Sequence, residues 1–175
     1  MSDGVSGAAV RRGELELLLA YLNSEREHVL QCLEGLDEAT LRRAVLPSGW
    51  SCLGLIQHLA LDVELFWFRA VIAGEQVAVD ELAGIENAWI VSEDAAAADV
   101  LGRYRQEIER ANAVIAATPL ESGPAWWPEG LFGAWRIQDL RQVVLHVMTE
   151  TAVHAGHLDA VRELVDGKQY LVLTS

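Results

Sequence analysis

Four polar residues near the C-terminus stand at intervals that an α-helix would bring to one face. In the stretch HVMTETAVHAGH, His146, Glu150, His154 and His157 follow one another at steps of four, four and three residues, and an α-helix has about 3.6 residues per turn. Imidazole and carboxylate groups hold divalent metals and also transfer protons. The spacing therefore predicts a metal site, a proton relay, or the solvated face of an ordinary helix.

The apolar residues of the same segment show that these four positions are not equivalent. At roughly 100° per residue, His154 lies about 40° from the centre of the apolar face, Glu150 about 80°, His157 about 100° and His146 about 120°. At a rise of about 1.5 Å per residue, Glu150 and His154 are about 6 Å apart along the axis, and His146 and His154 about 12 Å. Glu150 with His154 is therefore the best ligand pair, and His154 with His157 the second. The apolar face is formed by Ile137, Leu140, Val143, Val144, Val147, Thr151, Leu158, Val161 and Val165.

A metal site on one helix needs a ligand from another, and His58 lies in the middle of the most apolar segment. A single buried histidine is more often a core residue bonded to a backbone carbonyl or, here, to Asp62 one turn on. Its coincidence with an inward Glu–His pair favours a ligand instead. Glu150 also needs a positive partner, because burying an unpaired charge is costly. That partner is either a divalent cation or one of three arginines: Arg69, Arg136 or Arg141.

Other residues carry weaker signals. The only Glu-x-x-His match is EREH at 25–28, and His28 is predicted to be exposed because it falls opposite the leucines of its helix. Cys52 is predicted to be a small buried hydrophobe rather than a thiolate activated by a helix N-terminus. No motif supports a nucleophilic side chain. Three tryptophans in one loop would cap the core, form a dimer face or line a pocket mouth: Trp126, Trp127 and Trp135.

Hydrophobic periodicity places these residues on four helices. Apolar residues recurring at i, i+3, i+4 and i+7 predict helices over residues of about 12–34, 52–74, 92–117 and 136–165. Residues 75–92 are predicted to be a long loop, which in compact proteins often covers a site. The pattern predicts an all-α four-helix bundle with long connecting loops, forming a single domain over 1–175 in which residues 1–11 are flexible.

Charge and composition exclude several classes of partner. The net charge is −13 and the acidic residues are spread along the chain, whereas nucleic-acid binding requires clustered Lys and Arg. The segment 52–73 carries too many polar and charged residues for a membrane span. Two cysteines cannot build a disulfide framework, and the N-terminus lacks the order of a secretory signal. We therefore expect a cytoplasmic protein that binds neither nucleic acid nor membrane.

Two blocks of the sequence resemble the DinB-like superfamily, in particular its mycothiol-transferase-like branch. They are LPSGWSCLGLIQHLALDVELFWFRAVIAGE (46–75) and HVMTETAVHAGHLDAVRELVDG (146–167). The resemblance implies a four-helix bundle that holds one divalent metal through His58, Glu150 and His154. We expect His157, which matches a further family histidine, and Asp62 to support these ligands.

The resemblance also implies an activity. It indicates a divalent-metal-dependent thiol S-transferase or thiol-dependent isomerase that serves detoxification. The metal, zinc or alternatively nickel or iron, would activate a low-molecular-weight thiol, mycothiol. The activated thiol would attack an electrophilic small molecule. We further expect a homodimer. Two alternatives stay open: a non-haem iron redox enzyme on the same His/Glu/His set, and a metal-binding stress-response module without catalysis.

Overall fold

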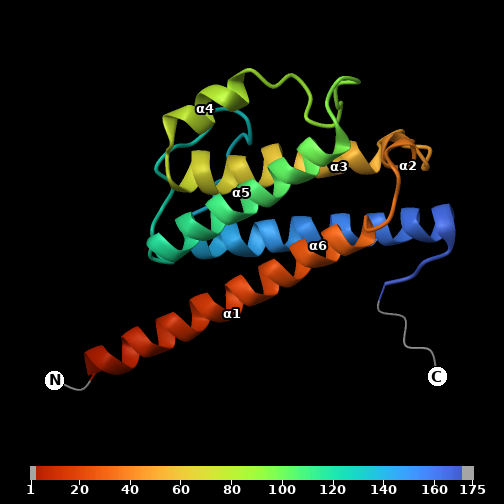
Figure 1. Cartoon of the computed structure of the whole chain (residues 1–175). Helices are drawn as coiled ribbons and strands as arrows, with labels where there is room; N and C mark the ends of the chain where they lie inside the picture. The colour runs from red at the N-terminus through yellow and green to blue at the C-terminus, as the bar shows by residue number, and fades with distance from the viewer. Residues whose placement is uncertain (1–2, 171–175) are drawn as a thin grey trace, which may run out of the picture.

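The computed structural model describes residues 3–170, which form helices and connecting segments (Figure 1). Within this range there is no β-strand, and Ala44 and Ser51 form an isolated β-bridge. The predicted all-α class is therefore confirmed. In chain order the helices are α1 (Asp3–Cys32), α2 (Glu38–Arg42), α3 (Cys52–His58), η1 (Leu59–Ile72), α4 (Gln76–Ala83), α5 (Ala97–Ala117) and α6 (Leu140–Asp166).

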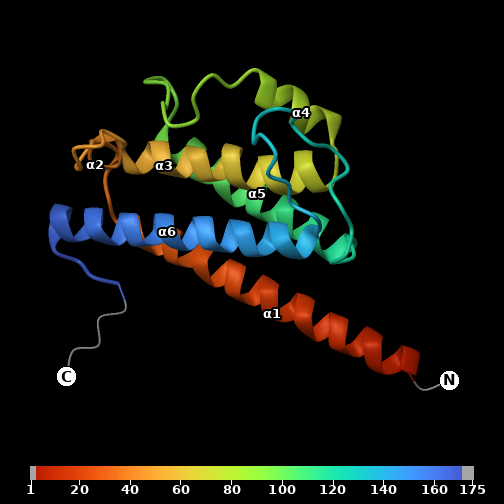
Figure 2. The same ribbon diagram turned by 180° about the vertical axis from the view of Figure 1, so that it is seen from behind.

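Four long helices make the bundle: α1, α5, α6, and the continuous helix formed by α3 and η1. α1 packs along α6, α5 packs against α3 and η1, and α6 also contacts η1. Figure 2 shows α6 beside the α3–η1 helix, with α1 crossing behind α6 and α4 on the outer side of η1. Leu55 and Phe68 of the α3–η1 helix and Val147 of α6 are fully buried in one core. The predicted four-helix bundle is confirmed.

The α3–η1 helix changes its hydrogen-bond pattern directly after His58. Ser51 caps the N-terminus by accepting a hydrogen bond from the Gly54 amide at 3.0 Å. From Leu59 to Ile72 the backbone is a π-helix, and at its end the amide of Ala73 donates to the carbonyl of Phe68, five residues back, at 2.9 Å. Such segments often occur at functional sites, and this one begins at the proposed ligand His58.

A buried ion pair ties three helices together behind this segment. Arg26 of α1 donates to both carboxylate oxygens of Glu64 of η1, at 2.7 and 2.5 Å. Both side chains are almost completely buried, at 2% and 1% exposed. Arg26 also donates to the side-chain oxygens of Asn23 and of Asn112 on α5, at 2.9 and 2.7 Å. This network fixes α1 and α5 against the helix that carries His58.

Helix boundaries differ from the predictions where apolar periodicity is weak. The predicted loop over 75–92 contains α4, so that prediction was wrong in part. α4 buries only Ala78, against Leu65 and Ala70 of η1, and therefore shows no apolar stripe in the sequence. α5 begins at Ala97 rather than near residue 92, and α1 begins at Asp3, within the segment predicted to be flexible.

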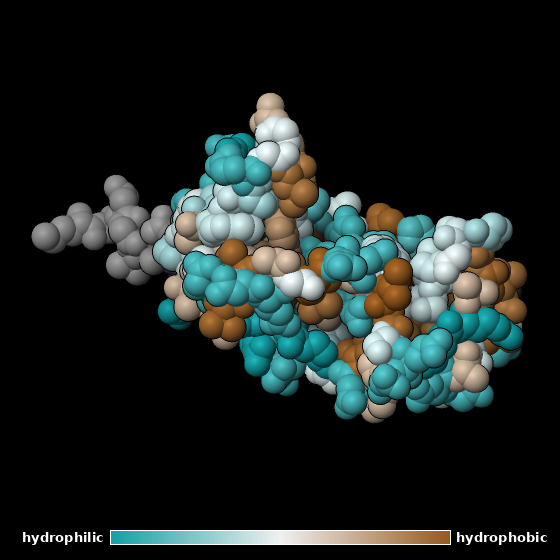
Figure 3. Space-filling view, turned by 90° about the horizontal axis from the view of Figure 1, so that it is seen from above, coloured by the Kyte–Doolittle hydropathy of each residue, from teal (hydrophilic) through white to brown (hydrophobic). Residues whose placement is uncertain are grey.

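The surface adds little to the question of partners. Over the described residues, no helix combines the length and the apolar character that crossing a bilayer requires. On the face seen from above in Figure 3, hydrophobic residues lie in separate patches among hydrophilic ones. The homodimer stays a prediction.

Candidate metal centre

The structure brings together the three residues that the sequence selected as metal ligands. His58 is the last residue of α3, and Glu150 and His154 lie one turn apart on α6. The His154 Nε2 atom is 3.3 Å from Glu150 Oε1, and the His58 Nε2 atom is 3.8 Å from the same oxygen. One ligand atom from each of the three residues lies within 4.8 Å of the other two. Two imidazoles and a carboxylate at this separation can converge on one ion.

The hydrogen bonding of His58 leaves one ring nitrogen without a partner. Its Nδ1 lies 2.9 Å from Asp62 Oδ2, as expected for an Nδ1–H that donates to the carboxylate. Its Nε2 is buried and has no hydrogen-bond partner among the residues that the structure describes. Buried polar atoms are rarely left in this state, and a metal-binding histidine commonly donates its other ring N–H to a carboxylate. The unpartnered Nε2, on the side of Glu150, therefore fits a divalent metal.

The charges of the site favour an ionised carboxylate. The hydrogen bond from His154 and then the nearby ring of His58 hold the pKa of Glu150 well below its usual range, against the opposing effect of burial. Burial disfavours the charged form of His58, but its hydrogen bond to Asp62 and the nearby carboxylate of Glu150 outweigh burial and raise its pKa. Glu150 is thus a carboxylate at neutral pH, the form in which it can bind a cation.

Within residues 3–170, none of the three arginines that the sequence allowed pairs with Glu150, so that alternative was wrong. Each of the three arginines that the sequence allowed pairs with another acid. Arg69 binds the buried Glu107 at 3.1 Å. The remaining two bind exposed or half-buried acids: Arg136 pairs with Glu129 at 2.6 Å, and Arg141 with Glu14 at 2.6 Å.

The two remaining histidines of α6 lie on either side of this centre. His157 is exposed, and its Nδ1 is 3.4 Å from His154 Nδ1. It therefore lies beside a proposed ligand, as expected. The ring of His146 packs against Trp67, with centroids 4.7 Å apart, and burial lowers its pKa. The sequence placed His146 far from the core direction and missed this aromatic contact, because Trp67 belongs to another helix.

Trp89 forms a wall of the site that the sequence did not reveal. Its ring stacks on His58, with centroids 4.2 Å apart and planes inclined by 19°. The side chain of Gln57 donates to the carbonyls of Ala88 and Ile90 at 2.8 and 3.1 Å and so holds the backbone on both sides of Trp89. At Gly54 a Cβ atom would overlap the Trp89 carbonyl oxygen, so this close approach requires glycine.

A cavity of about 370 Å³ opens beside the proposed ligands. Its walls are mostly apolar and aromatic, and they come from η1, from the loop before α6 and from α6 itself. Trp127 and Trp135 pack around Trp67 and Phe132 at centroid distances of 5.4 to 6.2 Å. These two tryptophans therefore support a pocket wall. The cavity is lined by His58, Asp62, Val63, Phe66, Trp67, Leu131, Phe132, His146 and Glu150.

Residues outside this centre answer two further predictions. Cys52 is buried, and burial raises the pKa of its thiol to about 11, so it is a buried hydrophobe rather than an activated thiolate. His28 was predicted to be exposed, and that was wrong: its side chain is only 18% exposed and bonds to Asp159 of α6. The pattern of α1 alone could not show that α6 covers this face.

Comparison with known proteins agrees with the resemblance seen in the sequence. A family model described as mycothiol-S-transferase matches residues 17–167 of the chain. This range contains all three proposed ligands. No curated protein and no solved structure matches the chain.

Proposed function

The chain belongs to the mycothiol-S-transferase family, and we propose that it is a divalent-metal-dependent enzyme that joins mycothiol to an electrophilic small molecule. The observation that carries the metal dependence is the buried, unpartnered Nε2 of His58 beside Glu150 and His154. The two imidazoles and the carboxylate would hold the ion. Zinc is the first choice, and nickel or iron also suit this ligand set.

The arrangement provides what a thiol transferase needs. A bound divalent ion lowers the pKa of a coordinated thiol, so that the nucleophilic thiolate is available at neutral pH. Asp62 holds the ring of His58 in the tautomer that presents Nε2. Trp89 covers one face of that ring. The thiolate is the nucleophile, which agrees with the absence of a nucleophile motif in the sequence and with the raised thiol pKa of Cys52.

Removal of the metal tests this proposal. The protein dialysed against a chelator should lose conjugation of mycothiol to a fluorogenic alkylating agent, and added zinc should restore the rate. Metal content is measured in the same samples. Conjugation that persists in metal-free protein would contradict the metal dependence. A metal-loaded protein that consumes no thiol would instead indicate a metal-binding module without catalysis. A coloured, EPR-active iron form with redox activity would indicate the non-haem iron redox enzyme.

The aromatic cavity is proposed as the site of an apolar electrophile. Phe132 lies in the loop before α6, is half-buried, and lines the cavity with Trp67. Phe132→Ala is expected to lower kcat/KM for an aromatic electrophile by about tenfold or more, because burying such a side chain is worth roughly 1.5–3 kcal/mol. A small polar electrophile should be affected little. Steady-state rates with both substrates measure the difference.

Leu164→Ala provides the matched control for Phe132→Ala. Leu164 is a large apolar residue of α6 that is 64% exposed and does not line the cavity. Its removal should leave kcat/KM unchanged for both electrophiles. An equal loss for the polar and the aromatic electrophile in Phe132→Ala would show that the cavity does not select the substrate.

A further inference from the structure

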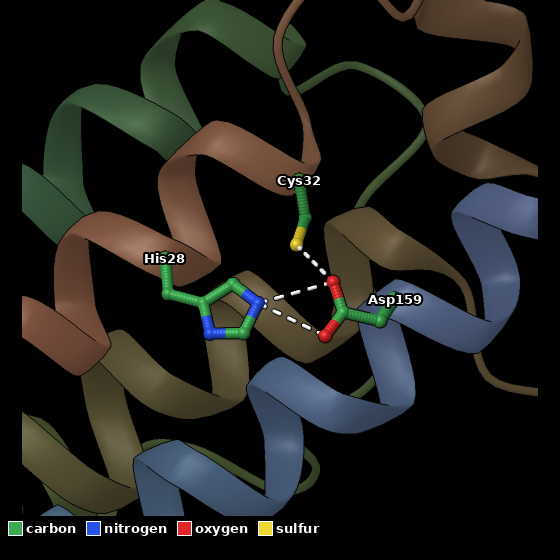
Figure 4. A group of neighbouring side chains, drawn as sticks. All are labelled: His28, Cys32 and Asp159. Carbon is green, nitrogen blue, oxygen red and sulfur yellow. Dashed lines mark hydrogen bonds and ion pairs between the residues drawn. The ribbon is translucent and has the colours of Figure 1, made fainter. Parts of the chain in front are cut away.

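A second group of ligand-type side chains lies between α1 and α6. His28 and Cys32 are one turn apart on α1, and Asp159 faces them from α6 (Figure 4). Asp159 is five residues beyond His154, which places it about 7.5 Å further along the helix and roughly 140° around it. The group is therefore separate from the candidate metal centre described above.

The three side chains converge closely. His28 Nε2 lies 3.0 and 2.9 Å from the two oxygens of Asp159, and Cys32 Sγ lies 3.1 Å from Asp159 Oδ1. One ligand atom from each residue lies within 4.8 Å of the others. Zinc bonds of about 2.3 Å to sulfur and about 2.0 Å to nitrogen and oxygen, at tetrahedral angles, separate the ligand atoms by about 3.3–3.5 Å. The His28–Asp159 and Cys32–Asp159 pairs would each have to move apart by only about 0.4 Å.

The order of the contacts argues against a catalytic triad. In a triad the histidine lies between the nucleophile and the carboxylate. Here the carboxylate of Asp159 lies between His28 and Cys32, and both bond to it. The thiol therefore has no histidine positioned to activate it. Three groups that meet at one point, each with a different ligand atom, suit a chelate better than a proton relay.

The arginine one turn beyond Asp159 on α6 bonds to groups other than Asp159. Arg162, one turn on, donates to the carbonyls of Cys32 and Glu34, each at 2.8 Å, and pairs with Asp166 at 2.9 Å. It therefore does not neutralise Asp159. The other ring nitrogen of His28 lies 4.0 Å from a carboxylate oxygen of Glu25, beyond hydrogen-bond distance.

The group is also next to open space. A cavity of about 270 Å³ is lined by Cys32 and Asp159, together with Lys168 and Tyr170 from the segment after α6. The ring of Tyr170 stacks on His28, with centroids 3.7 Å apart. An ion held by three protein ligands could complete its coordination with water from this cavity.

We propose that His28, Cys32 and Asp159 form a second divalent-metal site that prefers zinc and joins the C-terminal end of α1 to α6. A thiolate, an imidazole and a carboxylate are a ligand set for zinc rather than for magnesium or calcium, which select oxygen ligands. The site is independent of the catalytic proposal, since it shares no ligand with His58, Glu150 and His154.

Cobalt substitution distinguishes the two sites. Only the second site contains a sulfur ligand, so a thiolate-to-cobalt charge-transfer band in the near ultraviolet reports on it alone when no thiol is added. Full-length apoprotein titrated with Co²⁺ should bind two ions per chain and develop this band. Zinc should displace the cobalt and abolish the band. His58→Ala should lose one ion and keep the band.

Matched cysteine variants decide the assignment. Cys32→Ser should lose the band and one cobalt per chain, whereas Cys52→Ser should keep both. Asp159→Asn, which retains the thiol, should lose the band at the same cobalt concentration, and circular dichroism checks that helicity is unchanged. A wild-type protein without the band, or a band that survives in Cys32→Ser, would overturn the second site while leaving the proposed function intact.

Discussion

Replacing His58 with alanine is expected to remove the metal from the candidate centre and to abolish thiol transfer. His58 supplies the one ligand that comes from α3, and its buried Nε2 has no other partner. The two remaining ligands lie on one helix and would bind an ion weakly. Because the ion contributes several kcal/mol to such a reaction, kcat/KM should fall by a factor of about 10³ or more. Metal analysis and mycothiol conjugation measure the two effects.

Asp62→Asn is expected to weaken metal binding less than His58→Ala does. The asparagine can still accept a hydrogen bond from His58 Nδ1, but it no longer provides the charge that strengthens the bond. Metal affinity should fall by about 10- to 100-fold, and excess zinc should restore the rate. If His58→Ala retains full metal content and activity while helicity stays normal, the ligand assignment is wrong.

Breaking the buried Arg26–Glu64 pair is expected to have the largest effect on stability. Arg26→Met leaves Glu64 buried without its counter-ion, since both side chains are at most 2% exposed. Removal of one partner from such a pair costs about 3–5 kcal/mol. Urea unfolding followed by circular dichroism measures the change in the free energy of unfolding. The double variant Arg26→Met with Glu64→Leu should recover most of it, because apolar residues of similar size replace buried pairs at little cost.

The pH dependence provides an independent check on the Arg26→Met variant. Burial already raises the pKa of Glu64, against the opposing effect of Arg26. Without the arginine, the folded-state pKa rises further above the unfolded value, so folding takes up a proton and stability falls as pH rises. The loss should therefore be smaller at about pH 5 than at about pH 8. Arg136→Met, which removes an exposed pair with Glu129, should cost at most about 1 kcal/mol at either pH.

The proximity of the three proposed ligands was predictable because they lie on strongly patterned helices. The apolar residues of α6 fix its inward direction, so Glu150 and His154 could be separated from His146 and His157 by helix geometry alone. In the structure His154 is buried and Glu150 lies at the border, as that geometry requires. His58 could be added because the α3–η1 segment is apolar on nearly all sides and so must be central.

What the sequence missed depends on contacts between distant segments. His28 looked solvated from the pattern of α1, because only the packing of α6 brings Asp159 to it, 131 residues away. Trp89 lies in a segment without periodicity, and its place over His58 depends on the Gln57 hydrogen bonds to its neighbours. The sequence did not predict α4, because a helix that buries a single residue, Ala78, shows no periodic apolar pattern.

The fixed position of Trp89 has a consequence for how fast product can leave. Its ring covers one face of His58, and Gln57 and Gly54 hold its backbone in place. In the proposed reaction, reactants and conjugate would use the cavity lined by Trp67 and Phe132. The conjugate would be bulkier than either reactant and would carry the apolar group that these rings are proposed to bind. We expect its departure, rather than bond formation, to limit turnover as the electrophile grows larger.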